Sequence, residues 1–405
     1  MKLEKSPIDR FVALYLALQP IPPSLIESIA SSQDEIAAQL LKNPHVEAYP
    51  PTPEYQRRAW KSIVATLEEH SVEVSDEIYM HLVQLMSAPP SAGPPAASYS
   101  TYLLPCPDPG TAALEMWRRL PGLDNFDQSR RPVTILESRT TIERGTTGLR
   151  TWRASLDLAE WVFRNNRIVS FARVLELGSG VGLLGLTVAT LQKIFQASQT
   201  PEEAKNRPPE RTPCIVMTDV DEDVLTRCAT NLRLPCNTSD NQQTQVRALD
   251  WTDSVDPNRV RYVHAILDEV DADVVLAADV VYDPSIIPPL TRTLRLALDR
   301  PVSGSSSLRV AYVALTLRRE ETFAGFMKSA TPFQVRIRRS TSADLWVQVT
   351  AKTTILEIKR KIFEDGAIPP NNQRLTWDGK ELDNDDATLE SYGITTEVDI
   401  YVESV

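Results

Sequence analysis

The sequence of 405 residues carries a formal net charge of −11, with 42% hydrophobic and 24% charged residues. At roughly 150 residues per domain, this length predicts two or three domains. The composition excludes a wholly disordered or fibrous chain. The negative charge argues against a chain-wide grip on phosphate backbones, so we expect no nucleic-acid partner.

Cysteine and histidine spacing gives no sign of a metal site or a disulfide framework. The cysteines form no Cys-x-x-Cys pair, and the four histidines stand far apart. No apolar run reaches the roughly 18 residues that a membrane span needs, and the N-terminus lacks the pattern of a signal peptide. We therefore expect a reduced cytosolic or nuclear protein with no metal and no membrane partner. The cysteines are Cys106, Cys214, Cys228 and Cys236.

The first region, residues 1–97, is predicted to be a helical module. Apolar residues recur three or four positions apart from about residue 8 to residue 87, as at Phe11, Leu14 and Leu18. The stretch SAPPSAGPPAASYS then breaks this period. Its proline, serine and alanine content predicts a linker near residues 90–97.

The second region, residues 98–330, is predicted to be a Rossmann-like α/β domain. Buried-looking runs, namely RVLELG, CIVMTD, VRALDW, DVVLAAD and VAYVALTL, alternate with helical patterns. A parallel sheet covered on both faces requires such runs. The polar, proline-rich residues 198–213 between the first two runs are expected to form a solvated loop.

The strongest chemical signal is the segment VLELGSGVGLLG, residues 174–185. Gly180, Gly182 and Gly185 match the dinucleotide fingerprint, and such a turn lets a ligand approach the backbone and the start of a helix. Glu176 lies inside the strand end, where a carboxylate repels a pyrophosphate but can bind an amino group. This favours a cationic ligand such as S-adenosylmethionine. A nicotinamide cofactor and a purely structural turn remain alternatives.

Polar and aromatic side chains follow the next three strands at the same end of the predicted sheet. Asp219 can accept the ribose hydroxyls of a nucleoside, with Asp221 as a rival for that role. Trp251 can pack on an adenine ring or in the core. Asp279 and Tyr282 follow the fourth strand, at the edge where open α/β sheets bind ligands. Four strand ends together predict a binding site there.

Several motifs together resemble the seven-strand lysine methyltransferases, and among them the eukaryotic elongation factor 2 lysine methyltransferase family. They are SYSTYLLP, GTTGLRTW, LELGSGVG, LDW, ADVVYD and VALTLRREETF. The resemblance covers residues 1–327. It implies S-adenosylmethionine as cofactor, a protein substrate like elongation factor 2, and a cytoplasmic location. It places Trp152, Gly178, Ser179, Gly180, Asp219, Trp251 and Ala278 at the cofactor, where Glu176 and Gly182 complete the predicted site.

Asp279 and Tyr282 then face the incoming lysine. Methyl transfer is an in-line displacement from a sulfonium, so the enzyme must mainly hold a neutral amine in line with the methyl group. A carboxylate attracts and orients the lysine, and a closed aromatic pocket disfavours its charged form. We therefore expect both residues to position the lysine rather than to act as obligatory bases.

Residues 333–405 resemble a ubiquitin-like β-grasp domain. The residues IPP stop a helix, Asp378 and Gly379 make a tight turn, and Leu389, Tyr392 and Ile394 are expected in the core. The sequence shows no terminal diglycine, and Thr376 stands where ubiquitin's binding patch has isoleucine. We therefore expect a non-conjugatable tail that either docks a protein partner or is a passive fold.

Only residues 320–332 separate the fifth strand run from the ubiquitin-like sequence. Seven-strand methyltransferases continue there with an antiparallel pair, so the last two strands are expected to be missing and one sheet edge to be open. Two functional hypotheses arise. The retained candidate residues favour an active protein-lysine methyltransferase, and the missing strands favour an inactive adaptor that docks partners through its ubiquitin-like domain.

Overall fold

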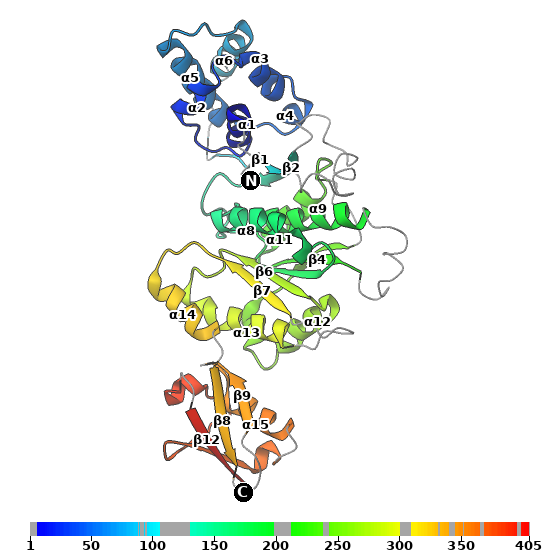
Figure 1. Cartoon of the computed structure of the whole chain (residues 1–405), viewed down its shortest axis with the longest axis vertical. Coiled ribbons are helices and arrows are strands. Elements are labelled where there is room, and N and C mark those ends of the chain that lie inside the picture. The colour runs from blue at the N-terminus through cyan, green and yellow to red at the C-terminus, as the bar shows by residue number, and fades with distance from the viewer. Residues whose placement is uncertain are drawn as a thin grey trace. The chain divides into compact units, whose positions relative to one another are not determined.

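The structure is a computed structural model of the whole chain (Figure 1). It describes residues 6–87, 89, 93, 95–105, 130–197, 212–237, 243–299, 309–330, 333–339, 345–350, 352–364, 368–394 and 398–404. Cys106, residues 90–92 and 94 of the predicted linker and residues 198–211 of the predicted loop lie outside these ranges. Two compact units contain the chain: Met1–Asp250, His264–Val280 and Ala297–Thr316 in the first, and Trp251–Val263, Val281–Leu296 and Leu317–Val405 in the second.

The N-terminal part of the first unit is helical, as the apolar spacing predicts. Ser6 and Thr52 cap two of its helices by accepting hydrogen bonds from the backbone N–H groups of Asp9 and Tyr55. Trp60 is fully buried and its Nε1 donates to Tyr15 Oη over 2.8 Å. The elements are α1 (Pro7–Leu16), α2 (Pro23–Ser28), α3 (Gln33–Ile36), the π-helical η1 (Ala37–Leu41), α4 (Pro44–Ala48), α5 (Pro53–Glu69) and α6 (Asp76–Ser87).

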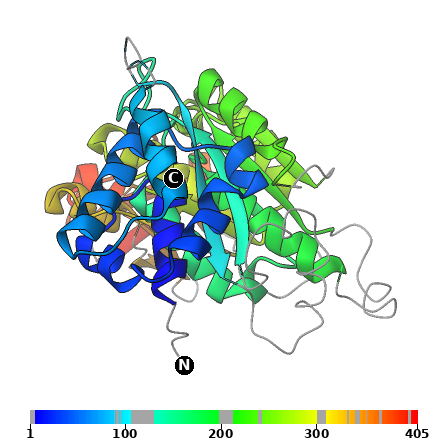
Figure 2. The ribbon, with the colours of Figure 1, turned by 90° about the horizontal axis from the view of Figure 1, so that it is seen from above.

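A two-stranded antiparallel sheet follows the helices, formed by β1 (Ser98–Pro105) and β2 (Arg130–Glu137). Its register pairs Ser98 with Glu137 and Tyr102 with Val133. Helix α1 packs against β1, and in Figure 2 the blue helices lie over the cyan strands. The hairpin was not anticipated as a separate sheet, because its two strands lie 24 residues apart in the sequence.

The central sheet of the first unit has the strand order β5-β4-β3-β6-β7, and all four neighbouring pairs are parallel. Helices α8, α9 and α11 pack on one face of it (Figure 1). The chain order reverses between β3 and β6, and open α/β sheets bind ligands at such a switch point. The bounds are β3 (Arg173–Leu177), β4 (Cys214–Asp219), β5 (Thr244–Ala248), β6 (Val274–Ala278), β7 (Val310–Ala314), α8 (Arg153–Arg164), η2 (Asn166–Ile168), α9 (Leu183–Ala197), α11 (Glu222–Leu232) and α12 (Val260–Val270).

Strand β7 is an edge strand of the central sheet in the part of the chain that the structure describes. Among the described strands, β7 pairs with β6 alone, and the next strand in the chain, β8, belongs to another sheet. The sheet therefore has five strands in the part of the chain that the structure describes. In the same part of the chain, no helix is long and apolar enough to cross a membrane.

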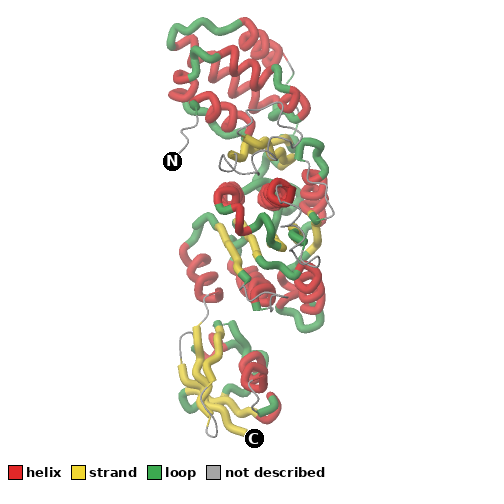
Figure 3. The backbone as a smooth tube through the Cα atoms, turned by 45° about the vertical axis from the view of Figure 1, so that its right-hand side comes forward, coloured by secondary structure: helices red, strands yellow, loops and turns green. Residues whose placement is uncertain are grey.

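The second unit contains the predicted ubiquitin-like β-grasp domain, whose strands cover α15 (Figure 3). Its sheet order is β11-β10-β12-β8-β9, with β12 parallel to β8. Leu389 and Ile394 are in the core and Tyr392 packs against it, as expected. The bounds are η4 (Trp251–Ser254), η5 (Pro284–Ile286), α13 (Ile287–Leu298), α14 (Glu320–Ala330), β8 (Phe333–Arg339), β9 (Leu345–Val349), α15 (Ile355–Glu364), η6 (Pro370–Asn372), β10 (Gln373–Trp377), β11 (Lys380–Glu381), η7 (Leu389–Tyr392) and β12 (Val398–Ser404).

Candidate functional site

The glycine segment forms the turn from β3 into α9. Gly178, Gly180 and Gly182 all have positive φ, at 68°, 54° and 96°. A Cβ atom on Gly182 would lie 2.8 Å from Cys228 Sγ, and one on Gly180 would lie 3.0 Å from the carbonyl oxygen of Gly148. Both the backbone conformation and the available space therefore require glycine here.

Glu176 is buried beneath this turn, with 2% of its surface exposed. Its Oε2 atom has no hydrogen-bond partner among the described residues. Burial raises the pKa of Glu176 to about 8, and the negative charge of Asp219 adds to the rise. A buried carboxyl oxygen without a hydrogen-bond partner is costly, and a ligand that brings hydrogen-bond donors or positive charge would lower that cost. The group therefore suits the cationic ligand that the sequence favours.

Asp219 at the end of β4 holds the glycine turn. Its Oδ2 accepts a hydrogen bond from the Gly180 N–H over 3.1 Å, and its Oδ1 accepts one from the Val220 N–H over 2.8 Å. Burial raises the pKa of Asp219, while these backbone donors lower it. Asp221, the rival in the sequence, instead caps α11 by accepting from the Val224 N–H. Only Asp219 is thus joined to the turn.

Strand β4 and the turn are also joined through Ser179. The Ser179 N–H donates to the Thr218 carbonyl over 2.8 Å, and the Thr218 N–H donates to Ser179 Oγ over 3.0 Å. Ala278, at the end of β6, packs against the core that this turn covers. The structure therefore brings Ser179, Asp219 and the glycines together at one end of the sheet, as predicted.

Trp152 directly precedes α8. It ends a segment in which Gly148 lies close to the glycine turn. The Trp152 Nε1 donates to the carbonyl of Thr147 over 3.0 Å. The close approach of Gly148 to Gly180 puts this segment beside the predicted cofactor residues. Its role at a cofactor stays a prediction.

Asp279 follows β6 in a left-handed conformation, with φ 59°. Such a conformation is uncommon for residues other than glycine. The side chain is 7% exposed, and its Oδ1 accepts a hydrogen bond from the Thr316 N–H over 3.1 Å. The Asp279 N–H donates to the Ala314 carbonyl, so this residue joins the ends of β6 and β7. That it faces a substrate lysine stays a prediction.

Two predicted site residues belong to the second unit. Trp251 is partly buried and begins η4. Tyr282 is 51% exposed and stands two residues before η5, which Asp283 caps by accepting from the Ser285 N–H. The roles of Trp251 and Tyr282 also stay predictions.

Two residues of the site region escaped the sequence reasoning. Asn231 is fully buried on α11; its Nδ2 donates to the Val181 carbonyl, and its Oδ1 accepts from the Leu136 N–H. Glu137 at the end of β2 is also buried. A polar residue on the apolar, buried face of an amphipathic helix was the available signal for Asn231. In Glu137 the signal was a carboxylate at the end of a run of buried residues.

Two family models match the chain in consecutive segments. Residues 131–331 match the model described as lysine methyltransferase, and residues 335–402 match the ubiquitin family. The human protein-lysine N-methyltransferase EEF2KMT is 30% identical over 305 residues, which is 72% of this chain and 76% of the human protein. The chain belongs to the lysine methyltransferase family.

A second relative supports the same assignment over a longer stretch. The protein-lysine N-methyltransferase EFM3 of Chaetomium thermophilum is 28% identical over 338 residues, covering 78% of this chain and 85% of that protein. The resemblance, the enzyme class and the ubiquitin-like domain predicted from the sequence are thus confirmed. Membership of this family requires a methyl donor and a protein substrate.

Proposed function

We propose that this enzyme uses S-adenosylmethionine as its methyl donor and binds it at the glycine turn after β3. The observation that carries the proposal is the buried Oε2 of Glu176 beneath that turn, which has no hydrogen-bond partner in the described part of the chain. The donor carries an ammonium group and a sulfonium, and both suit a site whose nearest side chains are carboxylates. A pyrophosphate-bearing nicotinamide cofactor would instead bring negative charge beside the carboxyl groups of Glu176 and Asp219 and would oppose their ionisation.

The residues in and beside the turn have different proposed roles in binding the methyl donor. Gly178, Gly180 and Gly182 give the turn its positive-φ backbone, Asp219 fixes the turn by holding the Gly180 N–H, and Glu176 offers an acceptor for an amino group. S-adenosylmethionine supplies a methyl group activated by the positive sulfur. The protein then has only to exclude water and align the acceptor amine.

We further propose a protein related to elongation factor 2 as substrate and the cytoplasm as the site of action. Support comes from the sequence resemblance to the elongation factor 2 lysine methyltransferases and from the similarity to EEF2KMT. Asp279 and Tyr282 are proposed to orient the lysine, since both follow β6 closely in the sequence.

Calorimetry with S-adenosylmethionine on the full-length chain tests the cofactor proposal. Saturable binding is expected, with loss in Gly180→Arg, whose side chain has no room beside the Gly148 carbonyl. Gly325→Ala is the matched control, because a Cβ there would meet only Ile287 Cδ1 at 3.9 Å. Circular dichroism checks that each variant folds. A folded wild type that binds NADH but not S-adenosylmethionine contradicts the proposal, and binding of neither cofactor favours the adaptor.

Transfer of a tritiated methyl group to purified elongation factor 2 tests the substrate. Asp279→Ala should abolish labelling while calorimetry still detects cofactor binding. Labelling unchanged by Asp279→Ala would remove this residue from the lysine site. A wild type that binds the cofactor but leaves elongation factor 2 unlabelled would reject the substrate alone.

The ubiquitin-like domain is proposed to dock a protein partner other than the common ubiquitin receptors. Thr376 is partly buried and pairs in register with Tyr401, which is 50% exposed. This surface therefore lacks an isoleucine where ubiquitin has one. Titration of the labelled full-length chain with a ubiquitin-interacting helix should leave the β10 and β12 amide resonances unshifted, and saturable shifts there would contradict this.

A further inference from the structure

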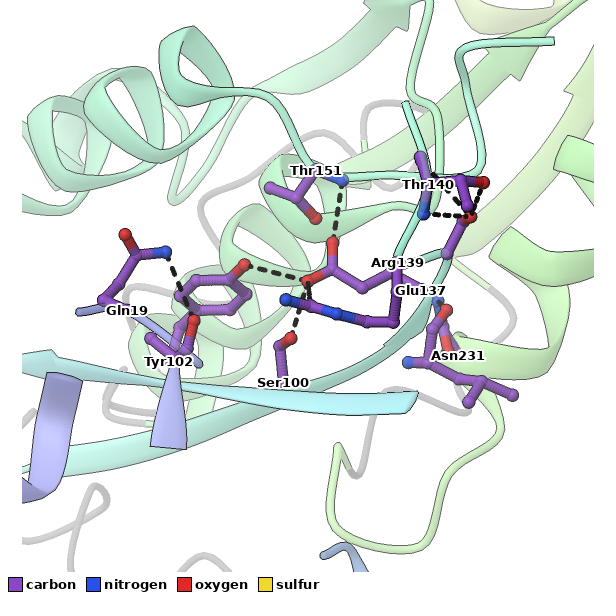
Figure 4. Close-up of polar contacts among 11 residues, drawn as sticks. Gln19, Ser100, Tyr102, Glu137, Arg139, Thr140, Thr151 and Asn231 are labelled. Atoms are coloured by element: carbon purple, nitrogen blue, oxygen red, sulfur yellow. Dashed lines mark hydrogen bonds and ion pairs between the residues drawn. The ribbon is translucent and has the colours of Figure 1, made fainter. Parts of the chain in front are cut away.

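A buried carboxylate outside the predicted cofactor site joins three elements of the first unit. Glu137, at the end of β2, is 3% exposed. Its Oε1 accepts hydrogen bonds from Ser100 Oγ over 2.6 Å and from Tyr102 Oη over 3.3 Å. Its Oε2 accepts from the Thr151 N–H over 2.8 Å, and Arg139 Nη1 lies 3.6 Å from Oε1 (Figure 4). Both carboxylate oxygens are therefore used.

The Thr151 bond matters most because Thr151 directly precedes Trp152, a predicted cofactor residue. Helix α8 starts immediately after that tryptophan. Since Glu137 lies at the start of the connecting segment and Thr151 at its end, the carboxylate closes residues 137–151 into a loop.

Further hydrogen bonds make this loop a defined structure. The Ser138 N–H donates to the Leu149 carbonyl over 2.7 Å, and Glu143 and Thr146 exchange two backbone bonds at 3.1 and 3.0 Å. The loop reaches the glycine turn at Gly148, whose carbonyl lies 3.0 Å from the Cβ position of Gly180. Fixing the two ends of the loop therefore fixes a wall of the predicted cofactor site.

Stability alone does not account for a carboxylate at this position. The hairpin already has continuous antiparallel pairing from Ser98–Glu137 to Pro105–Arg130. Burying a charge in a protein interior is costly unless all its acceptor sites are used, and apolar replacement is often neutral or stabilising. The charge does strengthen each hydrogen bond that it accepts. The carboxylate on the hairpin therefore adds a strong, charge-assisted hydrogen bond from the Thr151 N–H.

We propose that Glu137 is a positioning residue for the methyl donor: by holding the Thr151 N–H, it sets Trp152 and the Gly148 contact against the glycine turn. This inference rests on the proposed binding of S-adenosylmethionine at that turn. Glu137 itself touches neither cofactor nor substrate. Its loss should weaken cofactor affinity while the chemical step is largely kept.

The test compares Glu137→Ala with Tyr102→Phe in the full-length chain. Tyr102→Phe removes one hydroxyl group that donates to the Glu137 carboxylate. It keeps the aromatic ring and the Thr151 hydrogen bond, so it controls for general disturbance of the hairpin. Glu137→Ala is expected to raise the KM for S-adenosylmethionine about 10- to 100-fold, the worth of a charge-assisted hydrogen bond, with kcat changed little. Tyr102→Phe should leave that KM within about threefold of wild type, since its 3.3 Å bond is the longer one.

Hydrogen exchange gives a readout that needs no activity. In Glu137→Ala, the amides of peptides covering residues 145–152 should exchange faster than in wild type. In Tyr102→Phe, they should exchange at the wild-type rate. Glu137→Gln should rescue in part, because its amide oxygen can still accept from Thr151. Unchanged exchange and equal KM values in Glu137→Ala and Tyr102→Phe would overturn the inference.

Failure of the cofactor proposal is recognised separately. A folded wild type that does not bind S-adenosylmethionine refutes the proposed function, and with it the positioning of that donor. A wild type that binds normally beside a Glu137→Ala variant that binds equally well refutes only the role of Glu137.

Discussion

Glycines meet two different demands in the methyltransferase and ubiquitin-like regions. Around the β3–α9 turn they are required for lack of space: a Cβ on Gly185 would lie 2.2 Å from Met217 Sδ. In the ubiquitin-like domain, Gly379 and Gly393 have positive φ of 73° and 86°, yet no atom of the described residues lies within 4 Å of their Cβ positions. Packing against neighbours thus adds to the demand of the backbone conformation in the first region, whereas in the second the backbone conformation accounts for glycine without crowding.

Gly185→Ala tests directly whether lack of space requires glycine near this turn. In an exposed helix, alanine is favoured over glycine by about 1 kcal/mol. At Gly185 the methyl group collides with Met217 and comes 2.7 Å from Glu176 Oε2, so overpacking, which costs about 1–3 kcal/mol, should outweigh that gain. Thermal unfolding of the full-length chain should show a lower midpoint for the methyltransferase transition.

Gly325→Ala is the control for helix propensity. Gly325 lies in α14, where the added methyl group makes only an ordinary contact with Ile287. This variant should equal or exceed the stability of wild type. If both variants are stabilised alike, crowding at Gly185 is not what requires glycine there.

The same crowding buries the carboxyl group of Glu176, and this predicts a dependence of stability on pH. Burial raises the pKa of Glu176 from 4.5 to about 8 in the folded protein. Below pH 4.5 both folded and unfolded chains hold the proton. Between 4.5 and about 8 the unfolded chain loses it while the folded chain keeps it, so this group lowers stability as pH rises, by about 1.4 kcal/mol per pH unit.

Glu176→Gln removes that dependence, because glutamine has nearly the same shape and no ionisable proton. Without cofactor, the variant should gain stability relative to wild type as pH is raised from 5 to about 8, measured by denaturant unfolding. Its affinity for S-adenosylmethionine should fall. Parallel pH profiles for the two proteins would show that Glu176 is not the group responsible.

The backbone architecture followed from the sequence because its signals are local and repeated. Runs such as those ending in Leu177 and Ala278 have the hydrophobic continuity of strands buried on both faces, which gave the parallel sheet. The end of each such strand indicated where a ligand site lies. Leu389 and Ile394 were placed in the ubiquitin-like core for the same local reason.

Side-chain partners within the site did not follow from the sequence, because they depend on contacts between distant segments. From the sequence, either Asp219 or Asp221 could accept the ribose hydroxyls of the cofactor. Only the fold shows that one holds the Gly180 N–H and the other caps α11. The bond from the Thr151 N–H to Glu137 spans 14 residues of loop, and no spacing rule signals it.

The smallest expected effect is on the stability of the ubiquitin-like domain, where Gly393 is substituted. Gly393 ends η7 in the left-handed conformation, and its N–H donates to the Glu390 carbonyl over 2.9 Å. With open space around it, Gly393→Ala should cost only the backbone strain of that conformation, about 1 kcal/mol, and Gly393→Asn should cost less because asparagine tolerates it better. Hydrogen exchange of the β10 and β12 amides in the full-length chain measures the domain's stability. A greater loss in Gly393→Asn than in Gly393→Ala would mean that side-chain size, and hence packing, limits this position as it does Gly185.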